Sequence, residues 1–482
     1  MCRLRNPSFR SMWPALAGLL LLFASAGCSA PQPQVPIPPP VKAVPEPGTL
    51  PFWQPLDAEL EARAPDLFAA LRAMDEKGDA DGVFTRGDAL AAGVPQLFGD
   101  LHTHPFMEFG ARPFFRGLPS SSREPWGHLD VMTTQVTFAG LRRGAVNLLF
   151  AFAYAPDVWP ACAKGKDGKL GEVLCQLRKA GEFCERHGHR MAIVRTAQEA
   201  RAIARSKRTA VVLGVEGADA IERLEDLETL HRAGVRIITL THFVNNHLAG
   251  AAASTLWRFE APNFLTPGEP TPDGYRRNPV GLSPFGVKVV RRMAELGILI
   301  DLEHSSDVAV RDVLAATENL DVPVLFTHTG MRAIHPSELN VSDETIRKVV
   351  ARGGLIGIIT LSTLLTAEGL DECRAFQAHF RHLLEVAGPK HVAIGSDFNS
   401  FSPRPAPCGG GPGFASTGIR SVGDFPGLLQ SLADEGVPVE VLEQMGENML
   451  RVLERAEARA AALTSRGDSG GKHGDEHRPA GW

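Results

Sequence analysis

Side chains that bind metals follow several apolar, strand-like runs that lie far apart in this sequence. Each run ends in a histidine or a carboxylate within a few residues: His102, His104, Glu216, His304 and His328. In a barrel of parallel strands the strand ends converge on one face, so these residues can meet there around metal ions. This pattern constrains the fold more than any other feature, and it indicates a metal-dependent hydrolase.

Short apolar runs and amphipathic segments alternate along the chain. Eight runs read as strands: Leu97–Leu101, Ala145–Phe150, Ala210–Val215, Arg236–Thr241, Ile298–Leu302, Val322–Phe326, Leu355–Leu361 and Val392–Gly395. Apolar residues recur every three or four residues, as in helices, in Val287–Leu296, Val308–Thr317, Asp343–Arg352 and Ala375–Val386. Alternating strands and helices predict an α/β protein with a parallel sheet, closed here as a (β/α)8 TIM-type barrel. A ninth run, Met191–Val194, leaves the strand count open near strands two and three.

Two long connections follow predicted strands on the presumed catalytic face. Asn245–Pro284 carries several aromatic residues together with Arg276 and Arg277, and Ser400–Arg420 is rich in glycine and proline. Long loops at the C-terminal face of a barrel commonly hold substrate contacts. A passive surface insertion is the alternative, and it fits the glycine- and proline-rich loop better than the aromatic one.

The N-terminal residues read as an export signal. Three arginines precede the apolar run 15–24, which is too short to cross a bilayer and predicts a signal peptide over residues 1–27. Ser25-Ala26-Gly27-Cys28 resembles a bacterial lipobox, which implies lipidation of Cys28 and a membrane anchor. A plain cleavage site is the alternative. Ser29, which is not acidic, favours an exported lipoprotein of the cell envelope, placed at the outer membrane and facing the periplasm or the surface.

The remaining chain divides into a linker, a large domain and a tail. Residues 28–51 are rich in proline and predict an extended linker, residues 52–460 hold the barrel, and residues 461–482 are expected to be a disordered tail. Loss of the three signal arginines takes the formal charge from -5 to -8, so nucleic acid is excluded as a partner. The sequence leaves the assembly state open, with a homodimer among the options.

Five cysteines lie in the predicted domain, and none has the spacing of a zinc ribbon. In an oxidising compartment an odd set allows at most two disulfides, and Cys162 with Cys175 is one candidate pair.

The residue types at the strand ends predict a metal centre of two ions. His102 and His104 are one residue apart, so a strand presents both on one side as a chelating pair. Imidazole and carboxylate together favour Zn(II), with Mn, Co and Fe not excluded. Glu216 follows a fully apolar strand, where a buried carboxylate needs a partner or a metal, and its two oxygens can bridge two ions.

The remaining ligand-type residues complete this arrangement. His304 and His328 are expected to bind the ion at a second site, and Asp397 is expected to bind the ion at the first. Two ions about 3.5–4 Å apart would share and acidify a water, giving a bridging hydroxide nucleophile. Asp397 is the candidate proton carrier, with a structural capping role as its alternative. His242, after Leu240-Thr241, could polarise a substrate carbonyl, and a buried structural histidine is the alternative reading.

Several stretches carry a resemblance to a known family. Gly214-Val215-Glu216-Gly217, Leu240-Thr241-His242, Ile300-Asp301-Leu302-Glu303-His304-Ser305, Pro323-Val324-Leu325-Phe326-Thr327-His328 and Ile394-Gly395-Ser396-Asp397-Phe398 occur in the family's order. From about residue 97 to 400 the chain resembles the membrane dipeptidase (renal dipeptidase) family of the amidohydrolase superfamily. The resemblance implies that Glu216 bridges two zinc ions, that His102 binds the first, and that His304 and His328 bind the second. It also implies that His242 contacts substrate, that Asp397 handles protons, and that dipeptides or related amides are hydrolysed.

The chain departs from the family pattern at two places. The family usually has His-x-Asp at the first strand, whereas this chain has His102-Thr103-His104. Before the segment Asn340-Val341-Ser342-Asp343 the family carries an arginine that grips the substrate carboxylate, and this chain has Leu339. Arg276, Arg277 and Arg332 are the candidate substitutes in substrate binding.

Three functions compete on this sequence. The first is a zinc-dependent hydrolase of dipeptides or small amides. The second keeps the metal centre but acts on a different amide or on a lactone, because Leu339 makes the pocket less cationic. The third is a non-catalytic, surface-tethered binding lipoprotein, which ranks last because Glu216, His304 and Asp397 are all present.

Overall fold

The structure of the protein is a computed structural model. It describes residues 97–106, 135–154, 162, 168–253, 268–365, 372–398 and 421–470, all within one compact unit that spans Thr49–Trp482. The predicted signal peptide 1–27, Cys28, the linker 28–51, the loop 400–420 and residues 471–482 lie outside the described residues.

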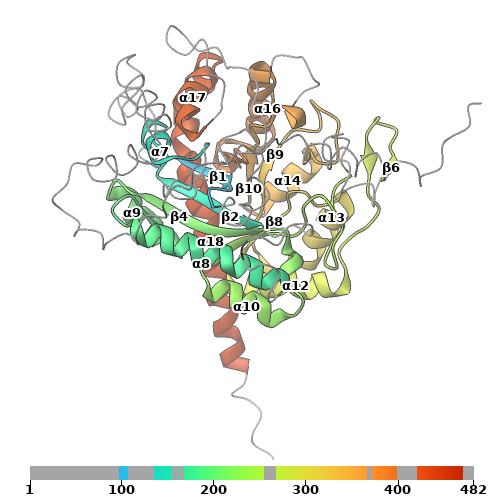
Figure 1. Cartoon of the computed structure of the whole chain (residues 1–482). Coiled ribbons are helices and arrows are strands. Elements are labelled where there is room, and N and C mark those ends of the chain that lie inside the picture. Colours follow the sequence, from blue (N-terminus) through green and yellow to red (C-terminus); the bar gives the residue numbers. More distant parts are fainter. Residues whose placement is uncertain are drawn as a thin grey trace, which may run out of the picture. The chain divides into compact units, whose positions relative to one another are not determined.

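Eight parallel strands form a nearly closed barrel with helices around it, as predicted (Figure 1). Each strand pairs with the next in one continuous order: β1 (Gly99–Thr103), β2 (Leu148–Tyr154), β4 (Thr209–Glu216), β5 (Val235–Thr239), β8 (Leu299–Asp301), β9 (Val324–Thr329), β10 (Leu355–Ile358) and β11 (Val392–Ile394). A parallel bridge between Thr103 and Phe398 joins the end of β1 to the segment after β11. This bridge brings the first and last strands together at the C-terminal face.

The ninth apolar run is a short strand outside this continuous order. β3 (Met191–Val194) pairs with Thr209–Val212 in the first half of β4, and β5 takes over the same edge at Leu213. This resolves the strand count, because β3 pairs only with β4 and is not one of the eight strands that follow one another around the barrel.

Helices follow most of the strands and cover the outside of the barrel (Figure 1). They are α7 (Phe138–Arg143), α8 (Gly168–Arg186), α9 (Ala197–Arg205), α10 (Leu224–Arg232), α12 (Pro284–Leu296), α13 (Asp307–Ala316), α14 (Asp343–Ala351), α15 (Ser362–Leu365), α16 (Glu372–Ala387) and α17 (Phe425–Asp434). Three of them begin after a serine whose hydroxyl accepts a hydrogen bond from the backbone three residues on: Ser283, Ser306 and Ser342. Such caps satisfy backbone donors that a helix start leaves open, which fixes where these helices begin.

Strand alternation divides the buried side chains into two layers. In β2, Leu149, Ala151 and Ala153 pack in the large cluster between strands and helices, whereas Leu148, Phe150 and Phe152 belong to a second cluster inside the barrel. The long helix α18 (Val439–Gly470) contributes Met449, Leu450, Val452, Leu453 and Ala456 to that inner cluster. Helix α18 therefore covers the barrel interior at the end opposite the strand C-termini.

A glycine allows this helix to approach so closely. A Cβ atom at Gly446 would lie 2.2 Å from the carbonyl oxygen of Leu97, which is closer than real side chains come. The domain end expected at residue 460 falls inside α18. The segment expected as a tail from residue 461 thus begins as helix.

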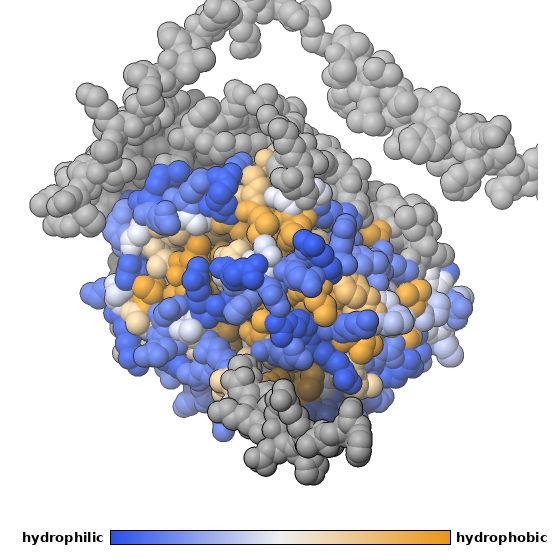
Figure 2. Space-filling model, turned by 90° about the horizontal axis from the view of Figure 1, so that it is seen from below, coloured by the Kyte–Doolittle hydropathy of each residue, from blue (hydrophilic) through white to orange (hydrophobic). Residues whose placement is uncertain are grey.

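Three of the four described cysteines are disulfide-bonded. Cys162 and Cys175 form a disulfide, as proposed from the sequence, and Cys373 is also disulfide-bonded. Cys184 is free and buried. The face drawn in Figure 2 intersperses hydrophilic and hydrophobic residues. Within the described residues, no helix has the length and apolar character that a membrane crossing requires.

Candidate metal centre

Six side chains from five other strand ends gather around the carboxylate of Glu216. The Nε2 atoms of five histidines lie within 3.8 Å of its oxygens: 3.0 Å for His104, 3.2 Å for His304, 3.5 Å for His102, 3.6 Å for His328 and 3.8 Å for His242. Asp397 joins through His104, whose Nε2 is 3.5 Å from its Oδ1. The structure thus brings together all six predicted metal ligands and His242.

Strand alternation points Glu216 into the barrel mouth. Val212 faces the interior, and Gly214 and Glu216 follow it at intervals of two. A Cβ atom at Gly214 would lie 2.7 Å from the ring of Phe152, so the glycine makes room for that ring. The ring of Phe152 in turn stacks on His102, with centroids 3.9 Å apart.

Two of the site residues adopt left-handed backbone conformations. His304 has φ 61° and Asp397 has φ 56°, a region that costs a non-glycine residue about 1–3 kcal/mol. Each lies three residues beyond the end of its strand, β8 for His304 and β11 for Asp397. The backbone N–H of Asp397 donates to the carbonyl of His102 over 2.9 Å, and that of Ala252 donates to the carbonyl of His304 over 2.7 Å. These bonds hold the two turns in place.

One threonine hydroxyl orients two of the imidazoles. Thr327 Oγ1 lies 3.0 Å from His102 Nδ1 and 2.9 Å from His328 Nδ1, and it donates to Asp301 Oδ2 over 2.7 Å. Its only proton goes to the carboxylate, so its lone pairs accept from both rings. Both rings then carry their proton on Nδ1 and leave Nε2 free to bind a metal. Thr239 supports this network by donating to Asp301 over 2.6 Å.

Two further contacts fix the remaining parts of the site. Asp100 accepts from the backbone N–H and the hydroxyl of Ser396, over 2.8 and 2.5 Å, which ties β1 to the turn that carries Asp397. His242 Nδ1 lies 2.8 Å from the hydroxyl of Tyr154, the last residue of β2. His242 is therefore oriented from the side opposite Glu216.

Burial and the charge of Glu216 divide the histidines into two groups. Burial lowers the pKa of His102 and of His328 well below the usual value, and it lowers the pKa of His242 to about 3. Burial also acts to lower the pKa of His104 and of His304, but the charge and hydrogen bonding of Glu216 outweigh it and raise both.

The carboxylate itself responds to its histidines. Burial acts to raise the pKa of Glu216, and the nearby charges of His242, His104 and His102 overcome this and lower it far below the usual value. An ionised carboxylate among imidazoles is the state that metal binding requires.

The donor set fits metal ions. Three groups of side chains have ligand atoms within 4.8 Å of one another: His102, His104 and Glu216; His102, His328 and Asp397; Glu216, His242 and His304. The Nε2 atoms of His102 and His104 are 3.1 Å apart, and those of His304 and His328 are 3.0 Å apart. Glu216 Oε1 is buried, and the ring nitrogens of His304, His102 and His328 lie 3.2, 3.5 and 3.6 Å from it. Ring nitrogens and a carboxylate oxygen that face one another in this way can bind metal cations.

The three candidate arginines lie on or beside a second cluster, around Tyr275 and Asp307. Arg332 makes a two-pronged ion pair with Asp307, at 2.8 and 2.7 Å, and it also contacts Tyr275 Oη at 3.1 Å. Arg277 donates to Tyr275 Oη over 3.0 Å and to Asp307 over 3.2 Å. Arg276 donates to the carbonyl of Gly268 over 2.6 Å. These contacts bind the guanidinium groups of Arg277 and Arg332 to protein partners.

Sequence reasoning missed the residues that orient the ligands. Tyr154, Thr327, Thr239 and Asp301 were not predicted to act at the site. Tyr154 continues the inward alternation of Phe150 and Phe152, so strand periodicity could have identified it. The contacts of Thr327 with two rings from different strands had no signal in the sequence. An irregular register between Asp100 and Thr103 also breaks the regular alternation of β1, which the sequence does not reveal.

Comparison with known proteins agrees with this geometry. A barrel with histidines and carboxylates gathered at its C-terminal face is the arrangement of a metal-dependent hydrolase. The model of the membrane dipeptidase family (peptidase family M19) matches residues 114–467, and the chain belongs to this family. The matched residues begin after His102 and His104.

Individual relatives share about a quarter of their residues with the chain. Dipeptidase ataJ of Aspergillus terreus is 27% identical over 396 residues, which cover 80% of this chain and 90% of that protein. Dipeptidase 3 of Rattus norvegicus is 26% identical over 366 residues, 76% of this chain and 64% of that protein. A metallopeptidase of Rhodobacter sphaeroides, solved with a phosphinate mimic of the dipeptide L-Ala-D-Ala, has a TM-score of 0.59 at 19% identity. It covers 75% of this chain and 99% of its own, and it supports the fold.

Proposed function

We propose that the protein is a dinuclear zinc hydrolase that cleaves dipeptides or closely related small amides. The observation that carries this proposal is the position of Glu216, whose two oxygens lie within 3.8 Å of imidazoles from four other strand ends. His102, His104 and Asp397 would hold one ion, His304 and His328 the other, and Glu216 both. When bound, such a pair of cations acidifies a water and stabilises the negative charge that develops on the carbonyl oxygen of the substrate.

The residues of the chain supply the other parts of the reaction. His242 points Nε2 toward the same space as Glu216, where an N–H can donate to the carbonyl oxygen of a substrate. Asp397 lies beside His104 at the edge of the cluster and remains partly exposed, so it can take a proton and pass it to a leaving amine. His104 replaces the carboxylate of the family pattern and removes one negative charge from the first site.

A specific observation favours a second substrate class. Leu339 is buried where the resemblance expects an arginine, and Arg332 is paired with Asp307. A substrate carboxylate would have to compete with Asp307 for that guanidinium. An uncharged amide or a lactone needs no such partner, so these substrates stand as the alternative to dipeptides.

The test compares wild-type protein loaded with zinc with Glu216→Gln and Glu344→Gln. Glu344 is an exposed glutamate paired with Lys348, so its variant controls for the same chemical change away from the site. We expect wild type to bind two zinc ions and to hydrolyse members of a panel of dipeptides, amides and lactones. Glu216→Gln should lose bound metal and at least a hundredfold in kcat/KM. Equal metal content and activity in wild type and Glu216→Gln would refute the proposal.

We also propose that the protein is an exported lipoprotein anchored through Cys28. The lipobox-like stretch before Cys28 and the disulfide between Cys162 and Cys175 support export, because disulfides persist in oxidising compartments. Mass spectrometry of the mature N-terminal peptide tests the anchor. An unmodified Cys28 in the mature protein would rule it out.

A further inference from the structure

Tyr154 stands at the junction between the metal cluster and helix α8. It ends β2 directly beside Glu216, its register partner at the end of β4. Its hydroxyl lies 2.8 Å from His242 Nδ1, and the two rings meet edge to face with centroids 4.6 Å apart. Tyr154 is thus the side chain that contacts the imidazole face turned away from Glu216.

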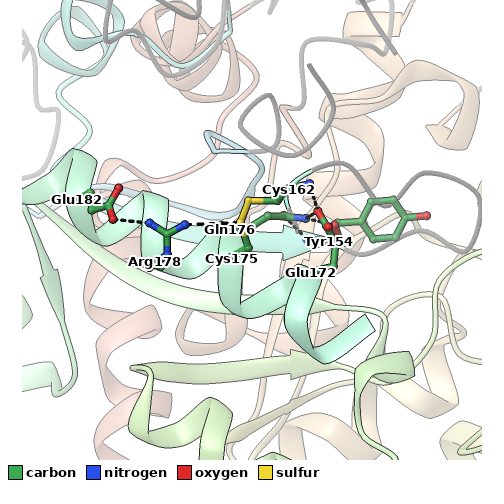
Figure 3. The surroundings of a disulfide bond; sticks show 7 residues. All are labelled: Tyr154, Cys162, Glu172, Cys175, Gln176, Arg178 and Glu182. Atoms are coloured by element: carbon green, nitrogen blue, oxygen red, sulfur yellow. Dashed lines mark hydrogen bonds and ion pairs between the residues drawn. A yellow bond between two sulfur atoms is a disulfide. The ribbon is translucent and has the colours of Figure 1, made fainter. Parts of the chain in front are cut away.

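A side chain bonds both backbone groups of Tyr154. Gln176 on α8 accepts from the N–H of Tyr154 over 3.1 Å and donates to its carbonyl over 2.6 Å (Figure 3). One amide group therefore satisfies both backbone groups of the residue, as a neighbouring strand would. Gln176 is buried, so this double contact is shielded from water.

Two further bonds fix the position of Gln176. Its amide also donates to Glu172 Oε1 over 3.3 Å, and that oxygen accepts from the backbone N–H of Cys162 over 2.7 Å. Cys162 is joined by a disulfide to Cys175, the residue before Gln176 (Figure 3). Glu172, Cys175 and Gln176 share one face of α8 because they are three and four residues apart. Loop and helix are thereby locked together where they hold Tyr154.

We propose that Tyr154 is a positioning residue for His242, held in place by Gln176 and by the cross-linked face of α8. The inference rests on the proposed function, because it assigns His242 the task of donating Nε2–H to a substrate oxygen. A hydroxyl can donate to a bare Nδ1 or accept from a protonated one. When the Tyr154 hydroxyl donates to the bare Nδ1 of a neutral ring, or accepts from Nδ1 of a protonated ring, His242 keeps an Nε2–H directed at the substrate space.

The kinetic test is a double-mutant cycle with Tyr154→Phe and Gln176→Leu. Because His242 would stabilise charge that develops during the reaction, Tyr154→Phe should lower kcat about tenfold and change KM less than twofold. Gln176→Leu should lower kcat similarly, and the double variant should be no worse than the poorer single variant. Glu182→Gln, on the exposed side of the same helix, is the matched control and should match wild type.

Spectroscopy provides a readout that does not depend on turnover. Long-range 1H–15N spectra of protein labelled at histidine report the tautomer of each ring, and His242 is assigned by its loss in His242→Gln. We expect the His242 signals of wild type and Glu182→Gln to coincide, and those of Tyr154→Phe and Gln176→Leu to be displaced. The signals of His187, which follows the far end of α8 and packs on Phe138 and Phe183, should stay fixed.

The outcomes separate this inference from the proposed function. An active wild type with an unchanged kcat in Tyr154→Phe would overturn the inference and leave the function intact. Additive losses in the double variant would also overturn it, because Gln176 would then act independently of the tyrosine. If wild type binds metal but hydrolyses nothing on the panel, the proposed function fails. The spectra still test the inference in that case, because identical His242 signals in wild type and Tyr154→Phe would overturn it on their own.

Discussion

The hydroxyl of Thr327 is shared by imidazoles assigned to both metal ions, so its removal should weaken both sites together. Thr327→Val keeps the shape of the side chain and removes the acceptor at 3.0 Å from His102 Nδ1 and 2.9 Å from His328 Nδ1. An orienting partner of a metal ligand is worth about 10- to 100-fold in metal affinity. Two buried N–H groups left without an acceptor cost about 1–3 kcal/mol each. Asp301 keeps the Thr239 hydroxyl and two backbone N–H donors, so its carboxylate is not left alone.

The assay titrates metal-free protein with zinc in competition with a coloured chelator, which resolves the two binding steps. We expect both affinities to fall about 10- to 100-fold in Thr327→Val and to recover in Thr327→Ser. Thr239→Val is the matched control, because it removes a hydroxyl from the same carboxylate but touches neither imidazole. It should lower the free energy of unfolding while keeping zinc affinity near wild type. Wild-type affinity at both sites in Thr327→Val would refute the reasoning, and loss at one site would limit the role to one ring.

Two further predictions concern stability away from the cluster. Burial lowers the pKa of His187 to about 3, so the folded protein keeps this ring neutral while the unfolded chain takes up a proton below about pH 6.5. The free energy of unfolding should therefore fall as the pH drops from about 6.5 toward 3, by up to about 1.4 kcal/mol per pH unit for this ring. Urea unfolding at pH 7 and pH 5 should show a smaller fall in His187→Phe than in wild type. An equal fall in the two proteins would contradict the assignment. Arg332→Lys should lower the free energy of unfolding by about 1–3 kcal/mol, because lysine cannot keep both contacts with Asp307; an unchanged urea midpoint would count against it.

The sequence could predict the barrel because strand ends follow directly from burial. Strands buried on both faces read as unbroken apolar runs, and polar residues reappear where the chain leaves the core. β4 was expected at Ala210–Val215 and spans Thr209–Glu216, and β11 was expected at Val392–Gly395 and spans Val392–Ile394. Ligand-type residues at such ends have to meet, whatever the details of each loop. Position along the strand therefore carried most of the information about the site.

The sequence could not predict how the other end of the barrel is covered. The inner cluster needs apolar residues from α18, which lies hundreds of residues from β1 along the chain. An amphipathic helix with this pattern could pack on any apolar surface, and the sequence does not say which one. The close approach at Gly446 depends on the carbonyl of Leu97, a backbone atom whose place is set only by the assembled barrel.

The direction of the imidazoles depends on irregular register, which periodicity alone conceals. In β1, Asp100 pairs with Leu149 and Thr103 pairs with Ala151, so three steps on one strand match two on the other. In β9, Phe326 pairs with Ile356 and Thr329 with Ile358, which is the same mismatch. Each strand thus fits one extra residue into its ladder.

The extra residue explains why two neighbours on each strand face the interior together. Leu101 belongs to the inner cluster, and strict alternation would turn His102 toward the surrounding helices. With the extra residue, Leu101 and His102 both occupy the space opposite Phe150, and Thr327 and His328 both occupy the space opposite Gly357. A Cβ atom at Gly357 would lie 2.1 Å from the carbonyl oxygen of Thr327, so the missing side chain is what admits this backbone. The two irregularities therefore place the Thr327 hydroxyl between His102 and His328, and a chain with regular β1 and β9 would lose that contact even with every ligand present.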